Sequence, residues 1–288
     1  MNTIPQNEIE YVIQTMRSHP EYFNLDSMIN AYKSCGLEVI AEPFKEEVLI
    51  PIKYALQMQQ PLSVIRIGDS EANLLTYGMY PETINLNYFV AKAAIARRKD
   101  SFTVDEHWLI ILRDLLMGAL AQADIIGVVG LWRPDETNNE IVIGRFLKDY
   151  RGVSGHWRAM DYMLTLANKK YFDTKIIASA HLYFSVLEHL DSLLILAKKI
   201  MIISNRKTII ENLQAKHPEL CFDYIEIGIN NADLNTLPDK PLFLNKVFLA
   251  LPENMSGYLC LIGAGIWAEI YCTWVKQRGG VAIVPVIY

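Results

Sequence analysis

Several features are scarce or absent in this chain of 288 residues. It has four cysteines and no Cys-x-x-Cys pair, so the sequence favours buried, reduced thiols over a zinc site. No apolar run reaches the roughly 20 residues that a membrane-spanning helix needs. The N-terminus also lacks the basic stretch and apolar core of a signal peptide. Together these absences predict a cytoplasmic protein.

Basic residues are also fewer than acidic residues. The chain has 27 Lys and Arg against 32 Asp and Glu, which gives a formal net charge of -5. A nucleic-acid partner is therefore not expected, because such binding usually needs a basic surface. Internal repeats, low-complexity tracts and long linkers are absent as well. Oligomeric state, including a homo-oligomer, stays open, because the apolar helical pattern at 104–123 suits either a core or a partner.

What the chain does have is a hydrophobic content of 51% and alternating helix and strand patterns. Short β-branched runs separated by helical periods predict a Rossmann-like α/β fold, with a mostly parallel sheet and helices on both faces. We expect residues 1–60 to form a helical extension packed on a main α/β domain of residues 61–288. The expected strands lie at 63–67, 124–130, 175–180, 199–204, 223–228, 258–262 and 281–287.

The strand expected at 63–67 leads into a glycine and two carboxylates, Asp69 and Glu71. In an open parallel sheet, ligands bind beyond the carboxyl ends of the strands, where this pair would lie. Mg²⁺ and Mn²⁺ prefer oxygen ligands, and Mg²⁺ often takes only one or two protein carboxylates beside water and phosphate oxygens. The pattern thus suits a divalent metal and a diphosphate, with Arg66 placed to contact a phosphate or orient a carboxylate. Alternatively, Asp69 caps the following helix and Glu71 complements its dipole.

Polar residues also follow other expected strands. His181 is a candidate general base or leaving-group contact, although a structurally hydrogen-bonded histidine is equally common. Ser204 ends the strand at 199–204, Asn205 and Arg206 follow it, and Arg206 could neutralise a diphosphate or mark an exposed helix start. The adjacent acids Asp135 and Glu136 form a second carboxylate pair on a loop. The basic end of an expected helix at 91–99 could reach phosphates, but a solvated helix end is the simpler interpretation.

A glycine-rich segment, Gly263-Ala-Gly265-Ile-Trp-Ala268, follows the strand expected at 258–262. The pattern Gly-x-Gly-x-x-Ala between a strand and a helix suits phosphate binding, or close packing of the helix on the strand. The acidic ribose partner of a dinucleotide site is missing, since 281–288 contain no Asp or Glu. NAD or SAM binding is therefore a minor alternative.

The segment Arg66-Ile-Gly-Asp-Ser-Glu71 resembles the Arg-Phe-Gly-Asp-Gly-Glu signature of the GT-D-fold glycosyltransferases. Residues 261–271 and 276–280 resemble the closing glycine-rich loop, helix and Gly-Gly turn of that family. The resemblance implies that Asp69 and Glu71 bind a divalent metal and a nucleotide-sugar, with Arg66 and Gly68 in the matching flank. Ser70 and Glu269 depart from the family pattern, which has glycine and lysine there.

The resulting hypothesis is a metal-assisted glycosyltransferase. It would move a sugar from a nucleotide-diphosphate donor, UDP-sugar above all, to a hydroxyl of a glycan, glycoprotein or glycolipid, with Mn²⁺ or Mg²⁺ as cofactor. The catalytic candidates are Asp69, Glu71 and His181. Because of the departures at Ser70 and Glu269, the alternative is a non-catalytic nucleotide-binding or scaffold protein with the same fold.

Overall fold

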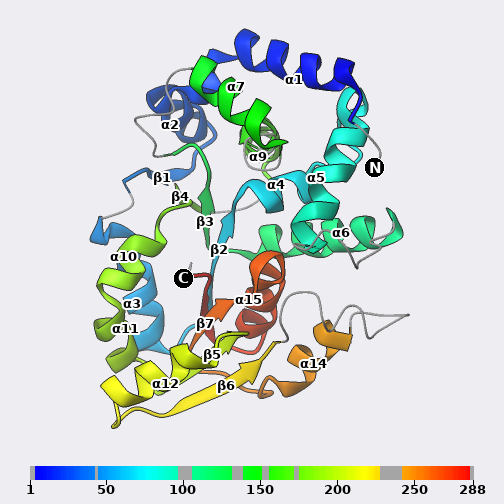
Figure 1. Ribbon diagram of the computed structural model, residues 1–288. Coiled ribbons are helices and arrows are strands. Elements are labelled where there is room, and N and C mark those ends of the chain that lie inside the picture. The colour runs from blue at the N-terminus through cyan, green and yellow to red at the C-terminus, as the bar shows by residue number, and fades with distance from the viewer. Residues whose placement is uncertain are drawn as a thin grey trace.

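The computed structural model describes residues 4–42, 45–96, 106–131, 139–150, 156–171, 175–227 and 242–285. Within these residues one sheet of eight strands runs in the order β1-β4-β3-β2-β8-β7-β5-β6 (Figure 1). Every neighbouring pair is parallel, so all the carboxyl ends lie along one edge. The strands are β1 Glu38–Ile40, β2 Leu62–Ile67, β3 Ile125–Val128, β4 Ile176–Ser179, β5 Lys199–Ser204, β6 Phe222–Glu226, β7 Tyr258–Gly263 and β8 Val281–Ile283.

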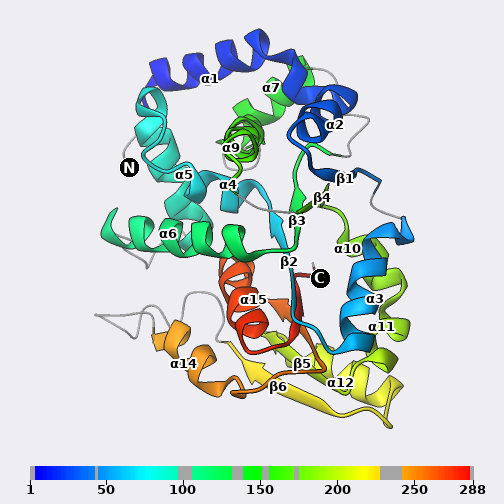
Figure 2. The ribbon, with the colours of Figure 1, turned by 180° about the vertical axis from the view of Figure 1, so that it is seen from behind.

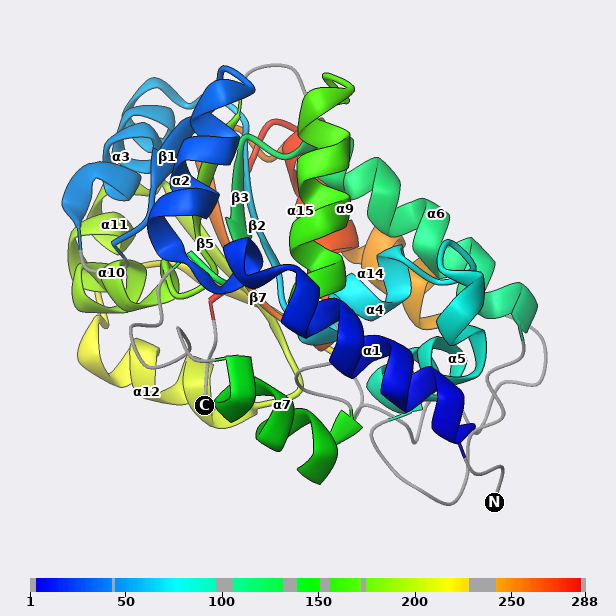
Figure 3. The same ribbon diagram turned by 90° about the horizontal axis from the view of Figure 1, so that it is seen from above.

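Helices cover both faces of the sheet, as the view from above shows (Figure 3). On one face lie α4 Asp69–Leu75, α6 Glu106–Gln122, α9 His156–Asn168, α14 Leu242–Ala250 and α15 Ala268–Gln277. On the other lie α3 Leu49–Met58, α10 Tyr183–Glu188, α11 Leu190–Leu196 and α12 Lys207–Lys216. The predicted α/β fold is confirmed.

The pattern of β2 explains the two cores. Side chains alternate along a strand, so Val64 packs with the α3 layer while Ile65 and Ile67 pack with the α4 and α15 layer. A strand buried on both faces reads as a continuous apolar run, which is how residues 62–67 look in the sequence. Because β2 lies between β3 and β8, its carboxyl end opens in the middle of the sheet edge.

The N-terminal region contains helices, as expected for residues 1–60, and one strand that the sequence pattern did not indicate. The helices are α1 Gln6–Ser18, α2 Leu25–Ser34 and α3, and Pro51 lies in the first turn of α3, where a proline interrupts nothing. β1 pairs with β4 at the sheet edge. β1 has three residues, which are too few to show the alternation of apolar and polar side chains that predicts a strand. The extent of a separate extension over residues 1–60 stays a prediction.

A third, smaller core joins α1 to α5 Ile84–Ala96 and α7 Asn139–Lys148. Its main members are Val12, Met16, Leu86 and Phe146. Two of its helices, α1 and α7, lie at the top of the molecule in Figures 1 and 2. This core fastens the first described helix to helices that begin more than sixty residues further on.

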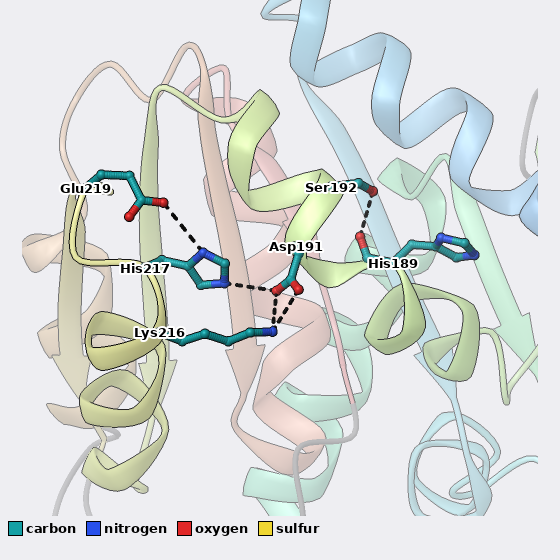
Figure 4. Close-up of polar contacts among 6 residues, drawn as sticks. All are labelled: His189, Asp191, Ser192, Lys216, His217 and Glu219. Atoms are coloured by element: carbon teal, nitrogen blue, oxygen red, sulfur yellow. Dashed lines mark hydrogen bonds and ion pairs between the residues drawn. The ribbon is translucent and has the colours of Figure 1, made fainter.

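Charged side chains tie α11 to the end of α12 (Figure 4). Asp191 accepts hydrogen bonds from Lys216 Nζ at 2.7 and 2.8 Å, and its Oδ1 lies 2.9 Å from His217 Nε2. Glu219 lies 3.7 Å from the other ring nitrogen of His217. The two helices that flank β5 in the chain are thereby held together. No helix in the described part of the chain is long and apolar enough to cross a membrane.

Candidate functional site

The turn from β2 into α4 places the two carboxylates at the middle of the carboxyl edge. Gly68 is the N-cap residue of α4, Asp69 is its first residue and Glu71 its third. Glu71 Oε2 accepts a hydrogen bond of 2.9 Å from the backbone N–H of Gly68. The capping position therefore belongs to Gly68 and not to Asp69, while Glu71 does satisfy one N–H at the helix start.

Gly68 is closely enclosed by its neighbours. A Cβ atom at this position would lie 2.7 Å from Glu71 Oε2 and 3.5 Å from Arg66 Nη2. The first distance is shorter than non-bonded carbon and oxygen atoms tolerate, so any side chain here would displace the Glu71 carboxylate. The glycine thus lets the Arg66 guanidinium and the Glu71 carboxylate approach the same turn.

Arg66 stands at the end of β2, with its side chain on the face that carries α10. Its Cζ atom lies 5.9 Å from the ring centroid of Tyr183, the first residue of α10. Its Nε atom is buried and has no hydrogen-bond partner among the described residues. A buried guanidinium nitrogen without a partner is costly, which points to a group that binds a ligand oxygen.

Glu269, the second residue of α15, faces the same turn. Its side chain is buried, with 2% of its surface exposed, and Oε2 has no hydrogen-bond partner within the described ranges. Burial raises its pKa well above the usual 4.5, and the neighbouring Glu71 carboxylate raises it further, while Arg66 opposes the shift. Sequence reasoning noted Glu269 only as a departure from a family pattern. The sequence did carry a signal for this burial, because Glu269 is a single acidic residue within the apolar run 266–272.

The glycine-rich segment occupies the predicted place between a strand and a helix. β7 ends at Gly263, a short 3₁₀ turn spans Gly265–Trp267, and α15 begins at Ala268. Gly265 is exposed and has φ +58°, a left-handed conformation that favours glycine. β7 is two strands from β2, so at about 4.8 Å per strand the segment lies ~10 Å from the end of β2.

The residues that follow β5 lie one strand further out, ~14 Å from β2. Ser204 is buried and pairs in register with Gly263, and its Oγ accepts a 3.1 Å hydrogen bond from the backbone N–H of Arg206. Asn205 is partly buried, and Arg206 is exposed at the N-cap of α12. Ser204 therefore shapes the turn, while Asn205 and Arg206 line the same edge as the glycine-rich segment.

His181 lies on the opposite side of β2, after β4. Its backbone N–H donates to Ser179 Oγ at 3.2 Å. Its ring stacks on Phe184 with an interplanar angle of 11° and lies 5.9 Å from the Tyr183 ring. Since Tyr183 also contacts Arg66, an aromatic group connects His181 to the motif. The sequence placed Tyr183 in the segment that follows this strand at the candidate site, but gave it no role of its own.

Two buried polar residues, Asn73 and Arg158, support the Asp-x-Glu turn through hydrogen bonds. Asn73 Nδ2 donates to the backbone carbonyl of Asp69 at 2.6 Å, and Arg158 Nη1 donates to Asn73 Oδ1 at 3.2 Å. Both side chains are fully buried. The Asp69 turn is thus held by hydrogen bonds that reach α9. The sequence offered a weak signal, a polar residue four positions after Asp69 within an apolar helix.

Two groups of predicted residues lie outside the described residues. They are the acidic pair Asp135 and Glu136, and the basic residues 97–99 of the helix expected at 91–99. Among the residues that are described, no cluster of three or more His, Cys, Asp or Glu side chains suits a metal ion. The carboxylates that the described chain can offer near the motif are therefore the pair Asp69 and Glu71, beside the buried Glu269.

Comparison with known proteins adds a family to this geometry. A family model described as a GT-D fold-like domain matches residues 44–284. A solved structure described as a selenomethionine-substituted domain of unknown function 1792 shares 16% identity, with a TM-score of 0.47 over 89% of this chain and 81% of that one. No curated protein matches. The family match spans the sheet from α3 to β8 and includes both the motif and the glycine-rich segment, and the fold is of the glycosyltransferase type. The chain belongs to the family of GT-D fold-like domains.

Proposed function

We propose that this protein is a glycosyltransferase that moves a sugar from a nucleotide-diphosphate donor, with UDP-sugar as the expected class, to an acceptor hydroxyl. The observation that carries the proposal is the group formed by Arg66, Glu71 and Glu269. Arg66 Nε and Glu269 Oε2 are buried without hydrogen-bond partners in the described part of the chain, directly beside the Asp-x-Glu turn. Such groups fit a site whose remaining hydrogen bonds come from a ligand.

The donor set suits a divalent cation. Asp69 and Glu71 present carboxylates at the start of α4, and Glu71 keeps Oε1 available while Oε2 accepts from Gly68. Two protein carboxylates are what Mg²⁺ or Mn²⁺ usually takes when phosphate oxygens complete its shell. A bound cation would offset the negative charge that builds on the departing diphosphate.

The donor phosphates have cationic and N–H partners on one side of β2. Arg66 would neutralise phosphate charge near the Asp-x-Glu turn, and the glycine-rich turn after Gly263 would offer backbone N–H groups at the same edge. Asn205 and Arg206 extend this line to ~14 Å from β2, which is the scale of a nucleoside diphosphate. We assign the diphosphate and nucleoside to the β2–β7–β5 side of the edge.

The acceptor would then approach from the β4 side. His181 lies there, two strands from β2, and its imidazole suits the task of taking a proton from an acceptor hydroxyl. Its stacking on Phe184 fixes the ring plane, which is a requirement for directed proton transfer. We propose that the acceptor is a hydroxyl of a glycan, glycoprotein or glycolipid.

Glu269 also supports a second candidate function. Glu269 stands where the family pattern has a lysine, so this position offers no cation to offset the charge of a departing diphosphate, and the same geometry also suits a protein that binds a nucleotide without transferring sugar. This candidate predicts nucleotide binding without turnover.

The test is release of UDP from a panel of UDP-sugars in the presence of Mn²⁺, with and without mixed acceptor glycans, followed by chromatography. The wild-type protein should release UDP from one donor, and Asp69→Asn should not. Binding of UDP without release from any donor would favour the non-catalytic candidate. Failure of wild type to bind UDP at all would contradict both.

A further inference from the structure

Helix α3 carries an exposed apolar stripe on its outer face. Ile50, Tyr54 and Met58 are 64%, 54% and 56% exposed, and they recur every four residues along a helix of ten. Residues four apart lie on one face of a helix, so the three side chains form a continuous ridge. The opposite face of α3, with Leu49, Ile52 and Leu56, is buried in the core.

The neighbouring helices extend this surface. α11 packs beside α3, and the two lie side by side on the outer layer in Figures 1 and 2. Ile195 on α11 is 68% exposed, and Leu187 on α10 is also exposed. Exposed apolar side chains are common singly, but a ridge of three with a neighbour on the next helix indicates an interaction surface.

The stripe is symmetric about its centre. Tyr54 lies at the middle of α3, with Ile50 one helical turn before it and Met58 one turn after it. If two copies of α3 pack antiparallel across a two-fold axis at Tyr54, Ile50 of each copy meets Met58 of the other. Ridges of residues four apart interdigitate in the commonest class of helix packing, and a two-fold interface requires this self-complementarity.

The charges at the two ends of α3 fit the same arrangement. At its N-terminal end Lys45 pairs with Glu42 at 3.4 Å and Lys53 pairs with Glu46 at 3.9 Å, which leaves the exposed Glu47 as the net acidic charge among the described residues there. Lys198 is exposed at the C-terminal end, where its Nζ donates to Gln59 Oε1 at 2.6 Å. Antiparallel packing places the acidic end of each copy against the basic end of the other. A parallel arrangement would instead face like charges, which disfavours it.

We propose that two copies of this chain form a reversible dimer through the α3 and α11 surface, with the α3 helices antiparallel and Tyr54 at the two-fold axis. The dimer is independent of the proposed function, because Ile50, Tyr54 and Met58 are not among the candidate site residues. The occupant is a second copy and not a lipid surface, because the stripe is flanked by acidic as well as basic side chains.

Sedimentation equilibrium over a wide concentration range tests the proposal. Wild type should show a monomer–dimer equilibrium. Tyr54→Asp should weaken the dimer more than tenfold, because it would bring two carboxylates together at the two-fold axis. Leu249→Asp is the matched control, since Leu249 is 79% exposed on α14, and it should dimerise like wild type. Circular dichroism checks that each variant is folded.

A charge exchange tests the antiparallel arrangement itself. Glu47→Lys and Lys198→Glu should each weaken the dimer, and the double variant should restore it. A wild-type protein that is monomeric at every concentration would overturn the proposal. Dimerisation of Tyr54→Asp equal to wild type, or monomeric wild type that binds anionic vesicles through this stripe, would overturn it too.

Discussion

Two groups of charged side chains in this molecule differ in how their charges are satisfied. At the carboxyl edge, Arg66 and Glu269 each have a buried polar atom without a hydrogen-bond partner in the described residues. Between α11 and α12, Asp191 accepts from Lys216 and pairs with His217 in a group that is mostly open to water (Figure 4). The unpaired buried atoms of the first group fit a site whose hydrogen bonds come from a ligand. The charges of the second group are already paired within the chain.

The two groups also titrate in opposite directions. Burial, followed by the Glu71 carboxylate, raises the pKa of Glu269, whereas hydrogen bonds from Lys216 and His217 lower the pKa of Asp191. A carboxyl whose pKa rises on folding is strained at neutral pH, and one whose pKa falls is favourable there. The difference separates the group that we propose to bind a ligand from the group that joins two helices.

The largest effect is expected for Arg66→Leu. Removing the guanidinium leaves Glu71 and Glu269 without their nearby positive charge, so the free energy of unfolding should fall by about 3 kcal/mol and UDP binding should be lost. Urea unfolding and calorimetry measure the two effects. The double variant Arg66→Leu/Glu269→Leu should recover most of the stability and none of the binding. A single variant as stable as wild type would show that Arg66 is not compensating buried carboxyls.

The next effect concerns pH. The folded pKa of Glu269 lies above its unfolded value near 4.5, so the unfolded state loses this proton first as pH rises. The contribution of Glu269 to the free energy of unfolding should therefore be largest below pH 4.5. It should fall by about 1.4 kcal/mol per pH unit between the unfolded and folded pKa values. In Glu269→Gln this contribution disappears, which urea unfolding at a series of pH values will reveal. Identical pH profiles for both proteins would argue against a buried, uncompensated carboxyl.

A tenfold effect on binding is expected for Gly68→Ala. Its Cβ would meet Glu71 Oε2 at 2.7 Å, so the carboxylate must shift and metal-dependent UDP binding should weaken about tenfold. Gly144→Ala is the control, because no atom lies within 4 Å of a Cβ there and alanine suits the interior of α7. Equal UDP affinity in both variants would place Glu71 outside the site.

The smallest effect is expected in the exposed group. In Asp191→Asn the link between α11 and α12 weakens slightly, and UDP binding should not change. The lowered pKa of Asp191 means that its contribution is present above its unfolded pKa near 3.8 and is lost as pH falls through the still lower folded value. Thermal unfolding at pH 7 and at pH 3 checks this, since the difference between wild type and variant should be smaller at the lower pH.

Much of the fold was predictable because buried parallel strands appear as apolar runs with clear boundaries. The run at 199–204 matched β5 at both ends. β1 was missed because three residues carry no period, and its place depends on pairing with β4. The motif turn and the glycine-rich segment were found because glycine and alternate carboxylates mark them locally.

The partners of the motif were harder to predict. Glu269 reaches the Glu71 turn from almost two hundred residues away, and only the strand order places α15 beside β2. Tyr183 and Arg158 belong to helices whose sequences look like ordinary core. Such contacts depend on tertiary packing between distant segments, and a local sequence pattern does not predict them.

The most direct test of the central claim is calorimetric titration of UDP with and without Mn²⁺, in wild type, Asp69→Asn and Glu71→Gln, with Asp191→Asn as the matched carboxylate control. The account predicts binding that requires Mn²⁺, is lost in both motif variants and is unchanged in the control. Binding that is indifferent to Mn²⁺ and to both motif substitutions would contradict it and would reduce the Asp-x-Glu turn to the start of a helix.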